Sequence, residues 1–255
     1  MAYAVAFAGK GGTGKTSLAG LTMKYLVSKR RGPVLGVDAD SNSCLNEALG
    51  VEVHTTVGRL REESLDTIRS GAGRPGGMSM EQIFDYEVSQ SVIEAEGFDL
   101  IVMGRPEGAG CYCSANNIIR KYSDKLSETY PYVVIDNEAG MEHLSRRTTH
   151  KVNLLIIVSD PTMKGILTAK RIHALVDELK LEVDKSILVI NRVIGDAASD
   201  LKEIAETAGI TVAGLVPQDE MISRFDLQGK PVFELPEDAV SVKALYGILD
   251  ACRIP

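Results

Sequence analysis

Residues 4–16 read Ala-Val-Ala-Phe-Ala-Gly-Lys-Gly-Gly-Thr-Gly-Lys-Thr, a short apolar run that leads directly into a glycine-rich loop ending in Lys15 and Thr16. The segment that follows, residues 17–27, has the apolar spacing of a helix. The pattern predicts a strand, a tight loop and a helix, which is the context in which a Gly-x-x-x-x-Gly-Lys-Thr loop holds the phosphates of a nucleotide. A loop of purely structural glycines would leave Lys15 and its spacing unexplained.

The predicted loop offers backbone and side-chain groups to a bound nucleotide such as ATP. Glycine readily takes the positive φ angles that turn successive N–H groups toward an anion, and we expect all four loop glycines to do so. Lys15 is expected to contact the β- and γ-phosphates, and the Thr16 hydroxyl to bind Mg²⁺. The residues predicted to bind the nucleotide are Gly9, Gly11, Gly12, Thr13, Gly14, Lys15, Thr16 and Ser17.

Composition places limits on the rest of the chain. With 255 residues, of which 44% are hydrophobic and 25% charged, the sequence is long enough for one substantial core, and we expect one domain spanning residues 1–255. A net charge of -7 argues against broad nucleic-acid binding, which usually needs a basic face. No stretch approaches the ~20 apolar residues of a membrane span, and the apolar start is too short for a signal peptide, so we expect a cytoplasmic protein.

Continuous apolar runs of four or five residues alternate with helical patterns along the chain. Such runs suit strands that are buried on both faces, so the sequence predicts an α/β fold with a single doubly wound, mainly parallel sheet. Two of the intervening helices are expected over residues 164–180 and 197–209. The predicted strands after the first are residues 34–37, 100–103, 132–135, 154–158, 187–190 and 212–216.

Two of these predicted strands deliver acidic residues where they end. Asp38 and Asp40, at positions i and i+2, can face the same side, where they could serve a Mg²⁺ ion and an attacking water. An ordinary acidic turn is the alternative for this pair, because Asp is common in turns. Asp136 follows the strand at residues 132–135, the position at which a P-loop ATPase holds Mg²⁺, and Gly140 can supply an N–H to the γ-phosphate.

The form Gly-Lys-Gly-Gly-Thr-Gly-Lys-Thr, with an additional lysine at Lys10, resembles the deviant P-loop ATPases, which include MinD, ParA and the nitrogenase iron protein. The resemblance implies an ATP-dependent homodimer in which Lys10 reaches the nucleotide of the partner subunit. It also implies that Asp40 positions the attacking water and that Lys10, Lys15 and Asp40 are the catalytic residues. Asn191 resembles the residue that reads the adenine edge, and Pro217 the loop that packs on the base, although either residue could instead form a strand-ending turn.

A Cys-Tyr-Cys segment distinguishes this chain from a generic member of that group. In an extended segment Cys111 and Cys113 project to one side, and a twofold dimer supplies this pair twice. A soft divalent ion favours four ligands, so the pair predicts one metal site shared by two subunits. Two buried structural thiols are the alternative. Cys44 and Cys252 lack a second cysteine at useful spacing, and we expect them to be packing residues.

The Cys-Tyr-Cys segment resembles the CooC-type ATPases, which assist nickel insertion into carbon monoxide dehydrogenase or acetyl-CoA synthase. The resemblance also includes the loop at residues 9–16, the segment at residues 38–44 and the Ala-Gly-Met-Glu-His-Leu-Ser-Arg run at residues 139–146. It implies an ATP-hydrolysing metallochaperone that binds Ni²⁺ or Zn²⁺ and acts on a nickel enzyme as its client.

Two other functions compete with this interpretation. Four thiolates also suit an iron–sulfur cluster bridging two subunits, as in an iron–sulfur ATPase or reductase. A partitioning ATPase that binds DNA or membrane is disfavoured, because residues 240–254 carry only Lys243 and Arg253 as cations and read as a final packing helix.

Overall fold

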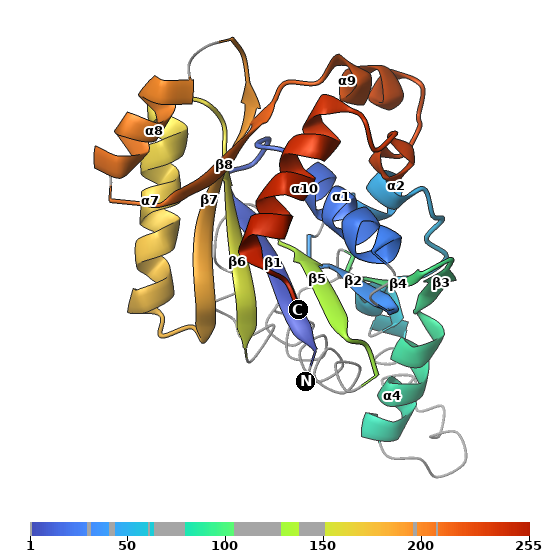
Figure 1. The fold of residues 1–255 in the computed structure, drawn as a ribbon. Coiled ribbons are helices and arrows are strands. Elements are labelled where there is room, and N and C mark those ends of the chain that lie inside the picture. Colours follow the sequence, from blue (N-terminus) through green and yellow to red (C-terminus); the bar gives the residue numbers. More distant parts are fainter. Residues whose placement is uncertain are drawn as a thin grey trace.

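The computed structural model describes residues 2–29, 32–40, 44–60, 62–63, 80–104, 129–137, 151–195, 198–207 and 209–255. These residues form one eight-stranded sheet in the order β3-β4-β2-β5-β1-β6-β7-β8, with helices on both faces (Figure 1). The sheet confirms the predicted fold class. Its strands are β1 (Tyr3–Gly9), β2 (Val34–Asp38), β3 (Ile93–Ala95), β4 (Phe98–Val102), β5 (Tyr132–Asp136), β6 (Val152–Ser159), β7 (Val183–Val193) and β8 (Val212–Pro217).

Neighbouring strands pair in parallel throughout this sheet, except at one edge, where β3 pairs with β4 in antiparallel orientation. The six strands predicted after the first are all present, with ends that differ by a few residues. The sequence analysis did not predict β3. This strand has three residues with an exposed glutamate at its centre, so it lacks the apolar run that marks the buried strands.

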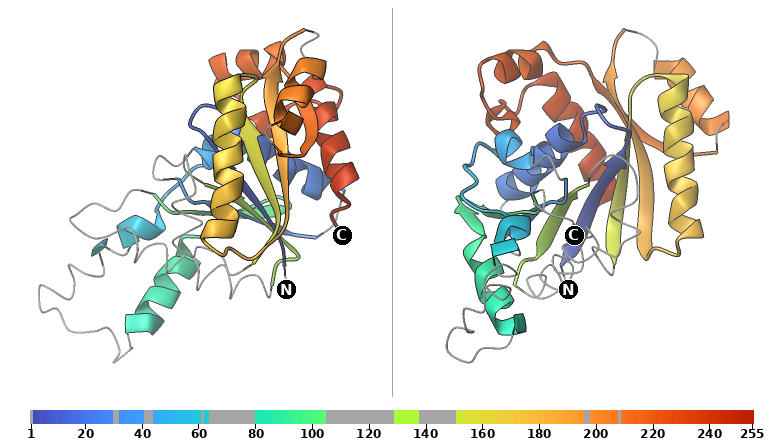
Figure 2. Two further views of the ribbon diagram at one scale, coloured as in Figure 1. Left: turned by 90° about the vertical axis from the view of Figure 1, so that its left-hand side faces the viewer. Right: turned by 180° about the vertical axis from the view of Figure 1, so that it is seen from behind.

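The helices divide between the two faces of the sheet (Figure 2). Residues of α1, α2 and α10 pack in one apolar cluster, and residues of α7 and α8 pack in the other. The helices expected over residues 164–180 and 197–209 correspond to α7 and α8. The helices are α1 (Lys15–Ser28), α2 (Leu45–Leu49), α4 (Met80–Gln90), α7 (Met163–Glu178), α8 (Ala198–Thr207), α9 (Glu220–Leu227) and α10 (Val240–Cys252), with a 3₁₀ turn η2 (Val232–Glu234).

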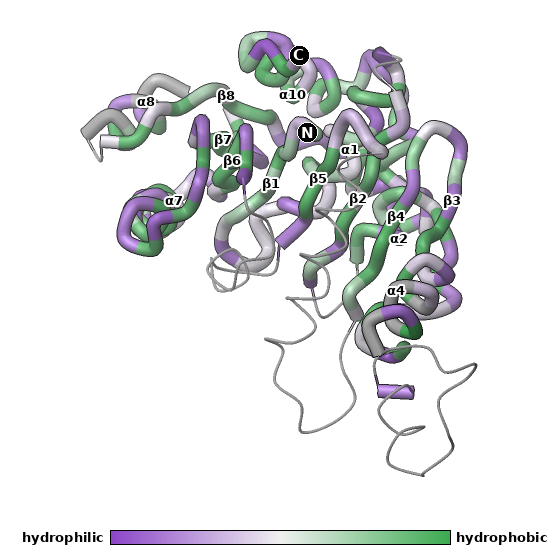
Figure 3. Tube along the Cα trace, turned by 90° about the horizontal axis from the view of Figure 1, so that it is seen from below, coloured by the Kyte–Doolittle hydropathy of each residue, from purple (hydrophilic) through white to green (hydrophobic). Residues whose placement is uncertain are grey.

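The central strands are apolar on both faces because helices cover both. Along β1, Val5 and Phe7 join the cluster beneath α1 and α10, whereas Ala6 and Ala8 join the cluster beneath α7. Figure 3 shows that the strands are mainly hydrophobic, whereas hydrophilic and hydrophobic residues alternate along helices such as α7. The predicted C-terminal packing helix is also confirmed, since α10 buries Val242, Leu245, Ile248 and Leu249.

The order of the strands reverses next to β1. The chain builds β2 to β5 on one side of β1 and β6 to β8 on the other side. In sheets of this kind the reversal opens a crevice at the carboxyl ends of the strands, and ligands bind there. β1, β2 and β5 end at this edge with Gly9, Asp38 and Asp136. In the part of the chain that is described, no helix is both long and apolar enough to cross a membrane.

Candidate nucleotide site

The glycine-rich loop joins β1 to α1 at the crevice. Gly9, Gly12 and Gly14 have positive φ angles of 149°, 80° and 89°, as predicted, whereas Gly11 does not adopt this conformation. The expected conformation of Gly11 was therefore wrong, since the turn is formed with three positive-φ residues, whereas its contact with a nucleotide stays a prediction. α1 begins directly after Gly14, at Lys15, so the loop ends at a helix N-terminus where backbone N–H groups attract an anion.

Two of these glycines also allow close approaches. A Cβ on Gly9 would lie 2.3 Å from the carbonyl oxygen of Val158 on β6, and a Cβ on Gly14 would lie 2.4 Å from the Asn191 side-chain nitrogen on β7. Real Cβ atoms do not approach heavy atoms this closely. The neighbouring strands therefore enclose the loop tightly from the side of β6 and β7.

The two lysines of the loop lie in different environments. Lys15 is 7% exposed, and its ammonium group donates a hydrogen bond to the Lys10 carbonyl oxygen at 3.3 Å. The Thr13 hydroxyl donates to the same oxygen at 2.9 Å. Lys10 itself is exposed. One cation therefore lies within the loop, while the other is accessible from outside.

Asp38 and Asp136 lie side by side on adjacent strands, in register, and both are buried. The Asp38 carboxylate accepts hydrogen bonds from the N–H groups of Asp40 at 3.0 Å and Leu45 at 2.9 Å. Burial raises the pKa of Asp38 to about 7; the Leu45 N–H opposes this effect and the Asp136 carboxylate adds to it. Asp38 thus holds the start of α2 against the sheet, a role that the sequence analysis did not predict.

Asp136 differs from Asp38 in lacking such partners. By hydrogen-bond geometry neither of its buried carboxylate oxygens has a partner among the described residues, although the Thr16 hydroxyl lies close enough to lower the pKa of the carboxyl group. Burial raises the pKa of Asp136 to about 6, while the nearby Thr16 hydroxyl and the Lys15 ammonium group oppose that rise. A buried carboxylate without donors is costly unless a cation or a ligand compensates it. Asp136 and the Thr16 hydroxyl therefore fit Mg²⁺, which is typically held by one or two carboxylates together with phosphates and water.

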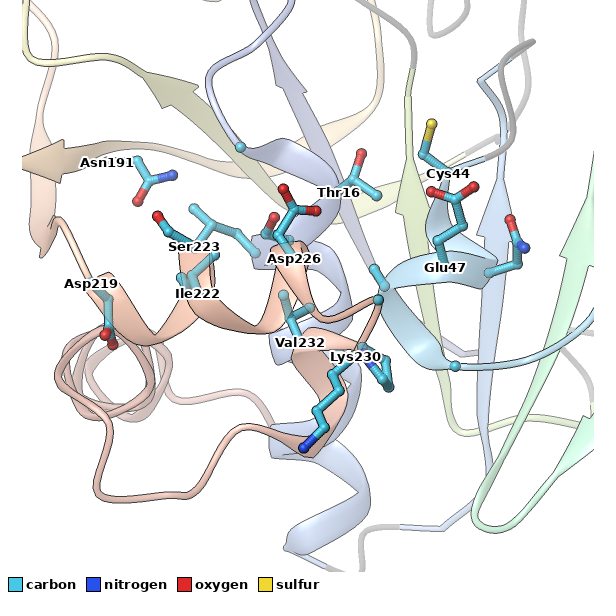
Figure 4. Close-up of a pocket in the computed structure, with 18 of the residues that line it drawn as sticks. Thr16, Cys44, Glu47, Asn191, Asp219, Ile222, Ser223, Asp226, Lys230 and Val232 are labelled. Atoms are coloured by element: carbon cyan, nitrogen blue, oxygen red, sulfur yellow. The ribbon is translucent and has the colours of Figure 1, made fainter.

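Asn191 and Pro217 line a cleft of about 1010 Å³ together with Gly14, Thr16 and Ser17 of the loop. Figure 4 shows Thr16 between Asn191 on one side and Cys44 with Glu47 on the other. Asn191 was expected to follow the end of its strand, but it lies within β7, which continues to Val193. Its side-chain nitrogen instead donates a hydrogen bond to the Thr13 carbonyl oxygen at 2.9 Å.

Two further residues line this cleft: Arg192, which the sequence analysis did not predict, and Cys44, for which it predicted a different role. Arg192 donates a hydrogen bond from its guanidinium group to the Gly12 carbonyl oxygen at 3.0 Å. No motif marks Arg192, because its placement depends on an irregularity in the pairing of β7 with β8. Cys44 was expected to be a packing residue, but it is exposed and lines the cleft, since it immediately precedes α2. For Cys252 the expected packing role is correct, because this residue is half-buried against the core.

Three predicted site residues, Cys111, Cys113 and Gly140, lie outside the described residues. Within the described ranges, no three His, Cys, Asp or Glu side chains are arranged so that they could hold a metal ion by themselves. Asp40 is described and half-buried, and its charge raises the pKa of both Asp38 and Asp136. The three carboxylates therefore interact at the end of the sheet.

The sequence comparisons agree with this geometry. Residues 4–232 match the family described as the CobQ/CobB/MinD/ParA nucleotide binding domain. The chain belongs to this nucleotide-binding family. An uncharacterized ATP-binding protein of Methanocaldococcus jannaschii is 42% identical over 234 residues, which cover 92% of each protein.

Two further similarities concern more distant proteins. The carbon monoxide dehydrogenase accessory protein CooC of Rhodospirillum rubrum is 29% identical over 240 residues, covering 91% of this chain and 89% of that protein. Among solved structures, a McdA–ATP complex from Cyanothece has a TM-score of 0.71 and 20% identity, and the similarity covers 100% of this chain and 97% of that chain. The structural similarity shows that this chain and the McdA protein share one fold.

Proposed function

We propose that this protein is an ATPase that acts with Mg²⁺. The observation that carries the proposal is the Asp136 carboxylate, which is buried, has no hydrogen-bond partner among the described residues, and lies near Thr16 and Lys15. A cation held by this carboxylate would compensate the buried charge. Membership of a nucleotide-binding family supports the same assignment.

Different residues bind the phosphates, hold the metal ion and orient the attacking water. The loop N–H groups and Lys15 bind the phosphates, and Thr16 and Asp136 would hold Mg²⁺, which would supply positive charge to stabilise the phosphates. Asp38 holds the segment that carries Asp40, and Asp40 orients the attacking water. The remaining assigned roles are a γ-phosphate contact for the Gly140 amide and contacts to the base for Asn191 and Pro217.

ATP would also bring two copies of the chain together. Lys10 is exposed at the loop, close to the proposed phosphate site but not buried in it as Lys15 is. An exposed cation there can reach the nucleotide of a facing subunit, as the resemblance to the deviant P-loop ATPases implies. The proposed active form is therefore an ATP-dependent homodimer.

A more specific proposal is that ATP hydrolysis drives delivery of a soft metal ion to a client nickel enzyme, such as carbon monoxide dehydrogenase. Two observations support it: the Cys-Tyr-Cys segment at residues 111–113, and the 29% identity to a carbon monoxide dehydrogenase accessory protein. Cys111 and Cys113 of both subunits would bind one Ni²⁺ or Zn²⁺ per dimer as cargo. Bound metal would then favour the dimer, because the ion links the subunits.

A double variant tests this cargo site. Replacing Cys111 and Cys113 by serine should abolish binding of one metal ion per dimer, because serine does not replace the thiolate ligands, and should leave ATP binding intact. Anaerobic, reduced protein is titrated with Ni²⁺ and Zn²⁺, and the dimer is followed by size-exclusion chromatography. Cys44→Ser is the matched control, because it removes one exposed thiol elsewhere and should keep the metal.

Three results would contradict the cargo proposal. Saturation at one ion per monomer would exclude a site shared between subunits. Retention of the metal by the double variant would place the site elsewhere. A brown protein that contains iron and labile sulfide at the same cysteines would instead favour an iron–sulfur ATPase or reductase.

A further inference from the structure

β7 contains an irregularity next to the glycine-rich loop. Asn191 pairs with Val216 and Val193 pairs with Pro217, so Arg192 is an additional residue in the pairing of β7 with β8. Arg192 has a φ of 60°, a left-handed conformation that is unfavourable for a residue with a Cβ. Bulges of this kind redirect a side chain and are common beside functional sites.

The bulge directs two successive side chains at two successive carbonyl groups of the loop. Asn191 donates to the Thr13 oxygen at 2.9 Å, and Arg192 donates to the Gly12 oxygen at 3.0 Å. The Arg192 backbone N–H in turn donates to the Asn191 side-chain oxygen at 2.9 Å, which sets the orientation of the amide. The two residues therefore hold the loop as one unit.

We infer that Arg192 is a positioning residue for the phosphates of the nucleotide, and that it acts through the loop rather than by contacting the ligand. The inference rests on the proposed function, because it assumes that this loop binds phosphates. A trans peptide bond points its C=O and N–H groups in opposite directions. Holding the Thr13 oxygen toward β7 therefore turns the Gly14 N–H away from β7, and holding the Gly12 oxygen does the same for the Thr13 N–H.

The surrounding contacts agree with this role. The Thr13 N–H, turned away from β7, donates to the Lys10 carbonyl oxygen at an N···O distance of 3.4 Å, and Lys15 donates to the same oxygen at 3.3 Å. The loop thus has its turn already formed, with two carbonyl groups held from outside. A preformed loop loses less conformational freedom when phosphates bind, so the two outer bonds should increase phosphate affinity.

The test compares ligands that differ in their phosphates. Arg192→Ala should weaken MgADP binding about tenfold, since a charge-assisted bond to the loop is lost, while adenosine affinity changes less than about twofold. Arg192→Gly should lose as much MgADP affinity but fold at least as well, because glycine accepts a φ of 60°. Arg192→Lys keeps a cation and one donor and should recover part of the affinity. Dissociation constants are measured by calorimetry for MgADP and by ligand-observed NMR for adenosine.

Several outcomes would overturn the inference. Equal losses for adenosine and MgADP would show that Arg192 contacts the base. Unchanged MgADP affinity in both Arg192→Ala and Arg192→Gly would show that the loop does not need the bond. A loss that disappears as salt rises from about 0.05 to about 0.5 M would indicate a direct, screened contact with phosphate. Failure of the wild-type protein to bind MgADP would instead contradict the proposed function itself.

Discussion

Lys15→Ala is expected to reduce ATP hydrolysis by at least about 10³-fold, because it removes the cation that faces the transferred phosphate. Lys15 is buried in the loop and its ammonium group donates a hydrogen bond to the Lys10 carbonyl oxygen, so it lies inside the proposed phosphate site rather than at its rim. The variant should also bind MgATP more weakly. Phosphate release measured at saturating ATP gives the rate, and circular dichroism checks the fold.

Lys10 provides a matched control for this prediction within the same loop. Lys10 is exposed, so Lys10→Ala removes an equal charge without opening a buried space. Lys10→Ala should keep MgATP binding by the monomer but lose ATP-dependent dimerisation, and with it hydrolysis. If Lys15→Ala hydrolysed ATP at the wild-type rate, the assignment of the loop would be wrong. If Lys10→Ala still dimerised with ATP, its action on the partner's nucleotide would be excluded.

The sheet was predictable because its buried strands have an unusual composition. A strand such as β6 has only one half-buried position among its 8 residues, and the others are buried. Such a strand must be apolar almost throughout, and its apolar run is visible without a structure. The edge strand β3 is too short to show this pattern and is formed by its pairing with β4. Pairing between distant segments is not encoded in any one of them.

The site shows the same division between local and non-local information. The loop glycines, Lys15 and Asp136 could be found because each belongs to a local pattern that follows a strand. Arg192 could not, since its position depends on a bulge between β7 and β8. Asp38 was predicted as an acidic residue of the site. Its hydrogen bond from the Leu45 N–H, which joins β2 to α2, could not be predicted, because no sequence motif relates the two residues.

Asp136→Asn is expected to have two opposite effects, both large. Hydrolysis should fall by about 10²-fold or more, because an amide is a poor ligand for Mg²⁺ compared with a carboxylate. The nucleotide-free protein should become more stable at pH 8, by about 2 kcal/mol, because the variant no longer buries a charge that Thr16 and Lys15 compensate only in part. For a chain of this length that gain corresponds to a rise in Tm of roughly 4–8 °C in a thermal scan.

The pH dependence of stability follows from the same two carboxyl groups. Asp136 and Asp38 have folded-state pKa values of about 6 and about 7, above their usual 3.8, so the folded protein binds these protons more tightly than the unfolded chain. Stability without nucleotide and Mg²⁺ should therefore fall as pH rises from about 4 to about 7. Asp136→Asn should flatten this decline, both by removing one group and by relieving repulsion on Asp38.

Added MgADP should stabilise the wild type above pH 7 more than it stabilises Asp136→Asn, because in the variant the loop and Lys15 still bind the phosphates but the carboxylate site for the cation is lost. Glu96→Gln is the matched control, since it changes an exposed carboxylate between β3 and β4 to an amide. It should leave both the pH profile and the response to MgADP unchanged. A wild-type Tm that stayed constant from pH 4 to pH 8 would show that these carboxylates are compensated within the protein, and the case for a cation beside Asp136 would then fail.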